Sequence, residues 1–385
     1  MKFFPTQQSM WSVFMAFALL ANSRVAFASV PITVWERPAP RDASGSLSFH
    51  YRPILGPKGD TVYIGGDRLF ALNTTDGDIL WSSGREFDKG TMEWLSPHVD
   101  AASALVLSAY VNSGTGRTNV VALAAESGIE EWRYEGTPAG TSVNCAPVAL
   151  GNLAIYAHGG PGAAVVALNL TTGNFVWKVD FNNTMALTCV ISTSATTFVV
   201  GTEDAVLWGV SIEGGGSTLW QYPIEIVSDP TVVEGILYVG SKDQRLHAIS
   251  VSSGQRLWLS PLLPYGYVRG LTAGDSDGRV FATSNSGAME GGAALYALQS
   301  ANGTVLWAYR PPNASVTLSS PRFIQSRKIV LMGSSDGFLK GLSRESGEVI
   351  WSLGLPSSAR VTTAVDQIRA VVFQQTAAMM FALQL

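Results

Sequence analysis

One phrase recurs seven times along this chain, and it constrains the fold more than any other feature. Each copy places a glycine four residues before a tryptophan, as in ALNTTDGDILW and ALQSANGTVLW. The glycines are Gly77, Gly128, Gly173, Gly216, Gly254, Gly303 and Gly347, and the matching tryptophans are Trp81, Trp132, Trp177, Trp220, Trp258, Trp307 and Trp351. Successive tryptophans are 38 to 51 residues apart. A period of this length is typical of repeat architectures.

Each repeat predicts four short β-strands. The first strand often begins near a proline, such as Pro53 or Pro97, and the second is strongly β-forming, as in TVYIGG and ILYVGS. The third carries an Ala-Leu pair, and a glycine turn leads to a fourth strand that ends at the tryptophan. The indole would bury a large apolar ring between neighbouring sheets. Four-stranded units of this length predict an all-β fold, a β-propeller.

Trp35 predicts an eighth blade. The chain ends on a third-strand pattern at Ala382-Leu383, whereas the segment ITVWERPAP around Trp35 resembles a fourth strand. We therefore expect the N-terminal strand to complete the last blade and to close an eight-bladed ring of four-stranded antiparallel blades. Seven blades is the alternative if Trp35 is accidental.

The N-terminus predicts an export signal. An apolar stretch, MWSVFMAFALL, precedes the small-x-small site Ala26-Phe27-Ala28, so we expect cleavage after residue 28 and a single propeller domain over residues 29–385. No cysteine near this point could carry a bacterial-type lipid anchor. We expect the mature chain to be secreted or to lie in a secretory-pathway lumen, or in the periplasm if the source is bacterial.

Glycosylation sequons agree with export. They begin at Asn73, Asn169, Asn182, Asn302 and Asn313. We expect a glycoprotein that folds without a cysteine framework, because the chain has only two cysteines.

Charge and hydropathy exclude two classes of partner. Charged residues make up only 14% of the chain and the formal net charge is −4, which argues against nucleic-acid binding. Beyond the N-terminus no apolar run is long enough to span a membrane. We expect a monomer.

The repeated phrase resembles the tryptophan-docking motif of the PQQ-repeat, or quinoprotein alcohol dehydrogenase-like, β-propellers, over essentially the whole mature chain. This family contains dehydrogenases and also non-catalytic members. The resemblance implies, for an enzyme, a quinone held near the axis against an unusual disulfide of adjacent cysteines, and a calcium ion held by acidic and amide side chains. This chain has no adjacent cysteines. Cys145 and Cys189 fall on the first strands of consecutive blades; they either pair or are simply small buried residues, and burial is the preferred interpretation.

Three residues are the candidates for a cofactor site. Trp94 lies outside the tryptophan register, and His98 and Asp100 follow Pro97 on a first strand, where side chains can reach the central channel. For all three a structural role is the preferred interpretation. Extra length falls in three loops rich in Gly, Ser and Asn, at residues 85–94, 112–118 and 285–292.

Two functions remain open. The first is a scaffold without an evident catalytic site that binds a protein or glycan partner through its loops. The alternative, which rests on the resemblance alone, is an alcohol or sugar dehydrogenase that depends on PQQ and calcium. The first is preferred, because the residues assemble no catalytic or metal-binding set.

Overall fold

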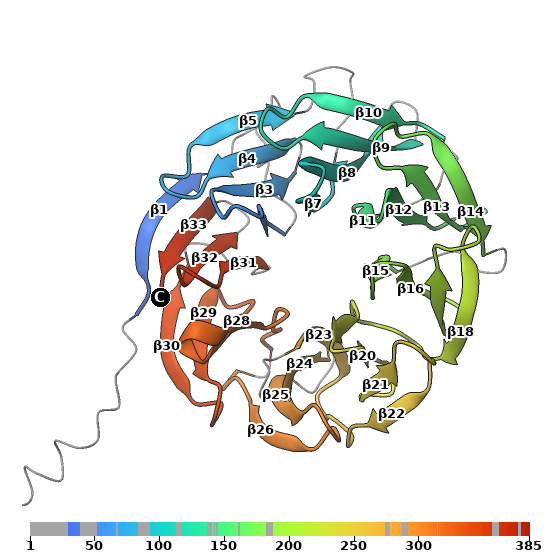
Figure 1. Ribbon diagram of the computed structural model, residues 1–385. Helices are drawn as coiled ribbons and strands as arrows, with labels where there is room; N and C mark the ends of the chain where they lie inside the picture. The colour runs from blue at the N-terminus through green and yellow to red at the C-terminus, as the bar shows by residue number, and fades with distance from the viewer. Residues whose placement is uncertain are drawn as a thin grey trace, which may run out of the picture.

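The computed structural model describes most of the chain beyond the N-terminal segment. The described residues are 30–38, 52–66, 68–83, 93–112, 117–136, 141, 143, 145–160, 162–181, 188–273, 278–286, 292–313, 315–355, 362–375 and 379–385. They form eight antiparallel sheets arranged as a ring of blades around a central axis (Figure 1). The prediction of an all-β, eight-bladed propeller is confirmed.

The first four blades follow one another along the chain. Blade 1 contains β2 (Ile54–Leu55), β3 (Thr61–Gly65), β4 (Leu69–Asn73) and β5 (Ile79–Ser83). Blade 2 contains β6 (Glu93–Trp94), β7 (His98–Asp100), β8 (Leu105–Asn112), β9 (Arg117–Ala124) and β10 (Glu130–Tyr134). Blade 3 contains β11 (Val148–Leu150), β12 (Leu153–His158), β13 (Ala164–Asn169) and β14 (Phe175–Asp180). Blade 4 contains β15 (Ile191–Ser192), β16 (Thr197–Thr202), β17 (Val206–Ser211) and β18 (Ser217–Pro223).

The remaining blades complete the ring. Blade 5 contains β19 (Thr231–Val233), β20 (Ile236–Gly240), β21 (Leu246–Ser250) and β22 (Arg256–Leu259). Blade 6 contains β23 (Tyr267–Ala273), β24 (Arg279–Asn285), β25 (Ala293–Gln299) and β26 (Val305–Tyr309). Blade 7 contains β27 (Arg322–Ile324), the short 3-10 helix η1 (Gln325–Arg327), β28 (Ile329–Gly333), β29 (Phe338–Ser343) and β30 (Val349–Gly354). Blade 8 contains β31 (Thr362–Asp366), β32 (Val371–Gln375), β33 (Met379–Gln384) and β1 (Ile32–Pro38).

Blade 8 joins the two ends of the described chain. Strand β1 pairs antiparallel with β33, so that Thr33 lies opposite Leu383 and Trp35 opposite Ala382. Figure 1 shows the blue N-terminal strand lying along the red C-terminal sheet. The prediction that the N-terminal strand closes the ring is therefore confirmed.

The repeated tryptophan lies opposite a small residue in every one of the eight described sheets. The pairs are Ala382 with Trp35, Ala71 with Trp81, Ala122 with Trp132, Ala167 with Trp177, Gly209 with Trp220, Ala248 with Trp258, Ala297 with Trp307 and Gly341 with Trp351. A β-bulge lies next to each pair, because the fourth strand has one residue more than its partner there. The small residue gives the indole space, which explains why alanine or glycine takes this position in each third strand.

Most of these indoles also contact the next blade. The Trp35 Nε1 donates a hydrogen bond to the Thr74 carbonyl at 2.9 Å, and the Trp132 Nε1 donates one to the Leu170 carbonyl at 2.8 Å. Equivalent bonds run from Trp81 to Ala125, Trp220 to Val251, Trp258 to Ser300 and Trp307 to Arg344. Trp177 faces the one hairpin that is a residue longer, and it lies less close to Gly216 than the other indoles lie to their glycines.

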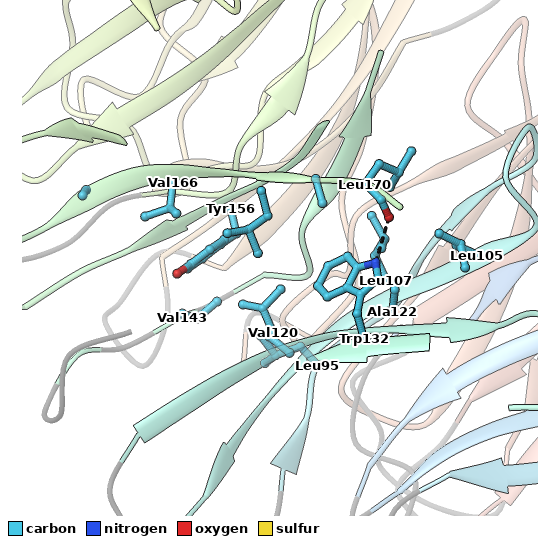
Figure 2. Packing of buried hydrophobic residues seen from close by; sticks show 14 residues of the cluster. Leu95, Leu105, Leu107, Val120, Ala122, Trp132, Val143, Tyr156, Val166 and Leu170 are labelled. Atoms are coloured by element: carbon cyan, nitrogen blue, oxygen red, sulfur yellow. Dashed lines mark hydrogen bonds between the residues drawn. The ribbon is translucent and has the colours of Figure 1, made fainter. Parts of the chain in front are cut away.

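The hydrophobic core lies between the blades. Figure 2 shows the cluster between blades 2 and 3, where Trp132 packs with Leu107, Val120 and Tyr156. The other described clusters likewise each combine side chains of two neighbouring blades, as do Trp35, Ile64 and Phe373 between blades 8 and 1. Each blade thus buries both of its faces only when the ring is complete.

The preferred prediction for the two cysteines, that they are unpaired buried residues, is wrong. Cys145 and Cys189 form a disulfide with a Cα–Cα distance of 5.4 Å, and both side chains are only partly buried. They precede β11 and β15, the innermost strands of adjacent blades, which approach within the distance that a disulfide spans.

The predicted signal peptide and the long loops cannot be compared with the structure. The predicted signal peptide, residues 1–28, lies outside the described residues, as does most of each long loop. Within the part that is described, no helix has the length and apolar character needed to cross a membrane.

Candidate functional site

A pocket of about 410 Å³ lies among the innermost strands of the ring. Its walls come from the innermost strands and adjoining turns of blades 1, 6, 7 and 8. The lining residues are Arg52, Pro53, Ile54, Leu55, Thr272, Arg322, Phe323, Gln325, Ala364, Val365 and Gln367. We call it the axial pocket.

The repeat register places the two arginines of the axial pocket. Arg322 lies on β27 opposite Leu331 of the second strand, which is the position that Ile54 takes opposite Tyr63 in blade 1. Arg52 lies two residues before Ile54, beside the proline that begins this strand. Because blades 7 and 1 flank blade 8, both side chains meet at the axis although they come from distant parts of the chain.

The electrostatics of the axial pocket are those of two cations held close together. Burial, together with the neighbouring Arg52 cation, lowers the pKa of Arg322 to about 9, and the Asp229 carboxylate opposes this shift. Burial also lowers the pKa of Arg52, again against the effect of Asp229. Both guanidinium groups remain protonated at neutral pH. Protein atoms therefore replace part of the water around each cation.

Neither arginine is neutralised by a direct contact. Within the part of the chain that the structure describes, neither the Arg52 nor the Arg322 guanidinium forms a hydrogen bond or an ion pair. Asp229 is exposed and acts on them from blade 5 through its field alone. More than a third of the Arg52 surface stays accessible to solvent, so solvent reaches this side of the pocket.

The Gln367 side chain links two sides of the axial pocket wall. The Gln367 Nε2 donates a hydrogen bond to the Phe323 carbonyl at 2.7 Å, and the Gln325 backbone N–H donates to the Gln367 Oε1 at 3.1 Å. These bonds tie blade 8 to blade 7. They hold the pocket wall in one arrangement.

The residues proposed from sequence lie elsewhere in the channel, on blade 2. His98 is opposite Leu107, which is the position that Arg322 takes in blade 7, and burial lowers its pKa against the nearby Asp100. The Asp100 Oδ2 accepts bonds from the Ser103 backbone N–H and hydroxyl, at 2.8 and 2.5 Å, so this carboxylate closes a hairpin turn. Trp94 lies on β6, which pairs with β8; its side chain lies outside what is described. Neither His98 nor Asp100 lines the axial pocket.

Sequence reasoning missed Arg52, Arg322 and Asp229, although a signal existed. Each lies next to a proline that begins a first strand, namely Pro53, Pro321 and Pro230. The argument that selected His98 beside Pro97 applies equally to these three residues.

Three of the sequon asparagines lie in turns between third and fourth strands. The side-chain Oδ1 atoms of Asn73, Asn169 and Asn302 accept hydrogen bonds from backbone N–H groups two residues on, at 2.7 to 3.0 Å. Asn313 makes the same contact in a loop, and Asn182 lies outside the described residues. Each of the four described asparagines thus stabilises its own turn.

The described residues do not fit a calcium-bound quinone. Calcium takes roughly six to eight oxygen ligands, many of them carboxylates. Among the described residues, no group of three or more His, Cys, Asp or Glu side chains could hold a metal ion. The axial pocket presents two arginines instead, and the disulfide joins residues of different blades.

Comparison with known proteins agrees with the fold. The family model described as outer membrane protein assembly factor BamB matches residues 32–260 and 203–378. A relative of that name from Burkholderia pseudomallei (strain K96243) is 28% identical over 243 residues, which cover 56% of this chain and 61% of that protein. The chain thus spans less than two thirds of that relative's length.

Solved structures share the architecture. The crystal structure of BamB from Moraxella catarrhalis superposes with a TM-score of 0.69 at 18% identity, covering 93% of this chain and 98% of that chain. The quinohemoprotein alcohol dehydrogenase from Comamonas testosteroni superposes with a TM-score of 0.70 at 12% identity, covering 94% of this chain and 78% of that one. At these identities the likeness shows the fold alone. Because the family model extends over most of the chain, the chain belongs to the family of the outer membrane protein assembly factor BamB.

Proposed function

We propose that this protein is a non-catalytic scaffold of the extracytoplasmic space that binds a protein partner and acts as an assembly factor. The family description supports the role, because it names an assembly factor. The Cys145–Cys189 disulfide supports an oxidising compartment, as the export signal at residues 1–28 predicts. We further propose that the protein is a monomer and that it is glycosylated at the sequons.

The observation that carries the proposal is an apolar band on the outer strands. In each bulge the extra residue of the fourth strand is the one before the tryptophan, as with Leu80 between Ile79 and Trp81. These side chains point away from the core. Exposed apolar side chains at the position before the tryptophan also occur in blades 4, 5 and 6, at Leu219, Leu257 and Leu306, which are 42% to 52% exposed. They are densest on blades 8, 1, 2 and 3, and we call that part the outer apolar band. It consists of Val34, Ile79, Leu80, Ile129, Phe175 and Val176, which are 47% to 65% exposed; Ile129 lies in the turn before β10.

Such a band favours a protein over a glycan as the partner. All but one of its side chains are aliphatic. Large exposed apolar areas on soluble proteins mark contact with other proteins, and the centres of protein interfaces are depleted of charge. The blades of the band are neighbours in the ring, so one partner can cover it (Figure 1).

The test is a site-specific crosslink followed by a binding measurement. A photoreactive residue at position 80 should capture a partner in the native host, and the same residue at position 368 should not. Ile368 is the matched control, because it is 95% exposed but lies in the turn between β31 and β32.

The captured protein is then purified and its affinity measured. Leu80→Glu should weaken binding about tenfold or more, because a charge at an apolar interface must be desolvated. Ile368→Glu should leave the affinity unchanged. Equal effects of the two substitutions would show that the outer apolar band does not bind the partner.

A further inference from the structure

The axial pocket is positively charged, whereas the molecule as a whole has a net negative charge. The chain carries a formal net charge of −4, yet the described residues that line the pocket include two arginines and no acidic residue. Confining two cations costs free energy unless an anion lies between them. Two guanidinium groups facing one cavity are suited to an oxyanion, since each offers a planar pair of N–H donors.

We propose that the axial pocket binds the carboxylate of an organic ligand with an apolar body, and that Arg52 and Arg322 hold this carboxylate. The site does not depend on which protein partner the outer apolar band takes.

The charge count selects a carboxylate over a phosphate. Arg52 and Arg322 contribute two positive charges, and the field of the exposed Asp229 carboxylate opposes both of them in part. A single carboxylate therefore meets less repulsion from Asp229 than a more highly charged anion does. A phosphate monoester carries roughly 1.5 to 2 negative charges at neutral pH, and Asp229 would repel the excess.

The walls select the apolar body. Beside the arginines the pocket presents Ile54, Leu55 and Val365, which are only half-buried and so available for contact. Phe323 and Pro53 complete this apolar side. A volume of about 410 Å³ is within the range of small-molecule pockets, and it would also admit a single peptide side chain with its neighbours.

An approaching carboxylate would also relieve the arginines. The lowered pKa of Arg322 reflects lost hydration and the adjacent cation. An anion at hydrogen-bond distance from both guanidinium groups reverses both effects and returns this pKa towards the ordinary range for arginine.

Isothermal titration of the full secreted chain with matched probes tests the proposal. One pair is hexanoate and hexanamide; the other is acetyl-Leu-Glu-Leu-amide and acetyl-Leu-Gln-Leu-amide. The charged member of at least one pair should bind about tenfold more tightly than its neutral partner. Preference within the first pair identifies a free carboxylic acid as the ligand class, and preference within the second identifies an acidic peptide side chain. No preference in either pair overturns the proposal, as does tighter binding of inorganic phosphate.

Variants separate the site from a general charge effect. Arg52→Gln and Arg322→Gln should each weaken carboxylate binding about tenfold, while Arg322→Lys should retain part of it. Arg52 is exposed, so its substitution leaves the fold intact even if that of Arg322 does not. Arg269→Gln is the matched control: Arg269 lies on the innermost strand β23, over the Tyr267 ring and outside the axial pocket. Equal weakening by Arg269→Gln, or none by the other variants, contradicts the assignment.

Discussion

At the scale of single residues, the glycine of each repeat serves both the turn and the neighbouring blade. Gly303 has a φ of +73°, and a Cβ placed on it would lie 2.5 Å from Cε3 of Trp258. The Trp258 Nε1 also donates a hydrogen bond to the Ser300 carbonyl at 2.7 Å. The indole therefore makes two contacts with the same turn, one by packing and one by hydrogen bonding. Positive φ and close approach together leave glycine as the one residue that fits.

Gly303→Ala should therefore lower the free energy of unfolding by about 3 kcal/mol, from backbone strain and from displacement of the indole. Gly235 is the matched control, because its φ is +76° but nothing lies within 4 Å of its Cβ position. Gly235→Ala should cost only the strain, about 1 kcal/mol. Urea unfolding followed by tryptophan fluorescence measures both, and equal losses would mean that the indole contact contributes nothing.

At the scale of elements, β1 is the strand on which ring closure depends. Its Trp35 is buried between blades 8 and 1 and bonds to Thr74 of blade 1. Without β1, strand β33 would present an unpaired edge and the core between blades 8 and 1 would lose its largest side chain. Both losses fall on the one blade made from two distant segments.

A chain that begins at residue 39 should consequently aggregate, or unfold at a much lower temperature than a chain that begins at residue 30. A synthetic peptide of residues 30–38 should restore monomeric elution and raise the unfolding temperature, because it supplies the missing strand in trans. The same peptide with Trp35→Ala should restore little. If the shorter chain is as stable as the longer one, β1 does not close the ring.

The disulfide joins elements in a different way, since it connects the inner ends of blades 3 and 4. A bond between residues 44 apart in sequence removes chain entropy from the unfolded state, about 4 kcal/mol in the loop-closure model. We expect the double variant Cys145→Ala, Cys189→Ala to unfold at lower urea concentration, and reductant to shift the natural chain but not the variant. A natural chain that is insensitive to reductant during unfolding would contradict this.

These elements also show what the sequence can and cannot predict. The blades are predictable because a small residue, a glycine and a tryptophan lie within a dozen residues of one another in all seven copies. The pairing of Cys145 with Cys189 depends on how two blades pack, which local patterns do not contain. The axial pocket is harder still, because Arg52 and Arg322 become neighbours only once the ring has closed around blade 8.

At the scale of the whole molecule, each blade depends on its neighbours, so protonation in one blade affects the stability of the ring. Burial is the largest cause that lowers the pKa of His98, His158 and His247, which lie in blades 2, 3 and 5. A carboxylate opposes burial at His98 and most directly at His247, whose Nε2 lies 2.9 Å from the Asp243 Oδ2. At His158 the Lys178 cation acts in the same direction as burial, and the Asp180 carboxylate opposes both without a hydrogen bond to the imidazole.

The sign of the pH effect follows from these directions. Unfolded histidines titrate near pH 6.5, so below that pH the unfolded chain binds protons that the folded chain does not. The free energy of unfolding should have its full value above about pH 7 and should decrease as the pH is lowered towards 5. His158→Asn should flatten this fall more than His247→Asn, because Asp243 already stabilises a protonated His247. Urea unfolding at pH 7.5 and pH 5 measures both slopes. A ring whose stability is constant over that interval, or one in which the His247 variant gives the larger flattening, would show that burial does not control these histidines.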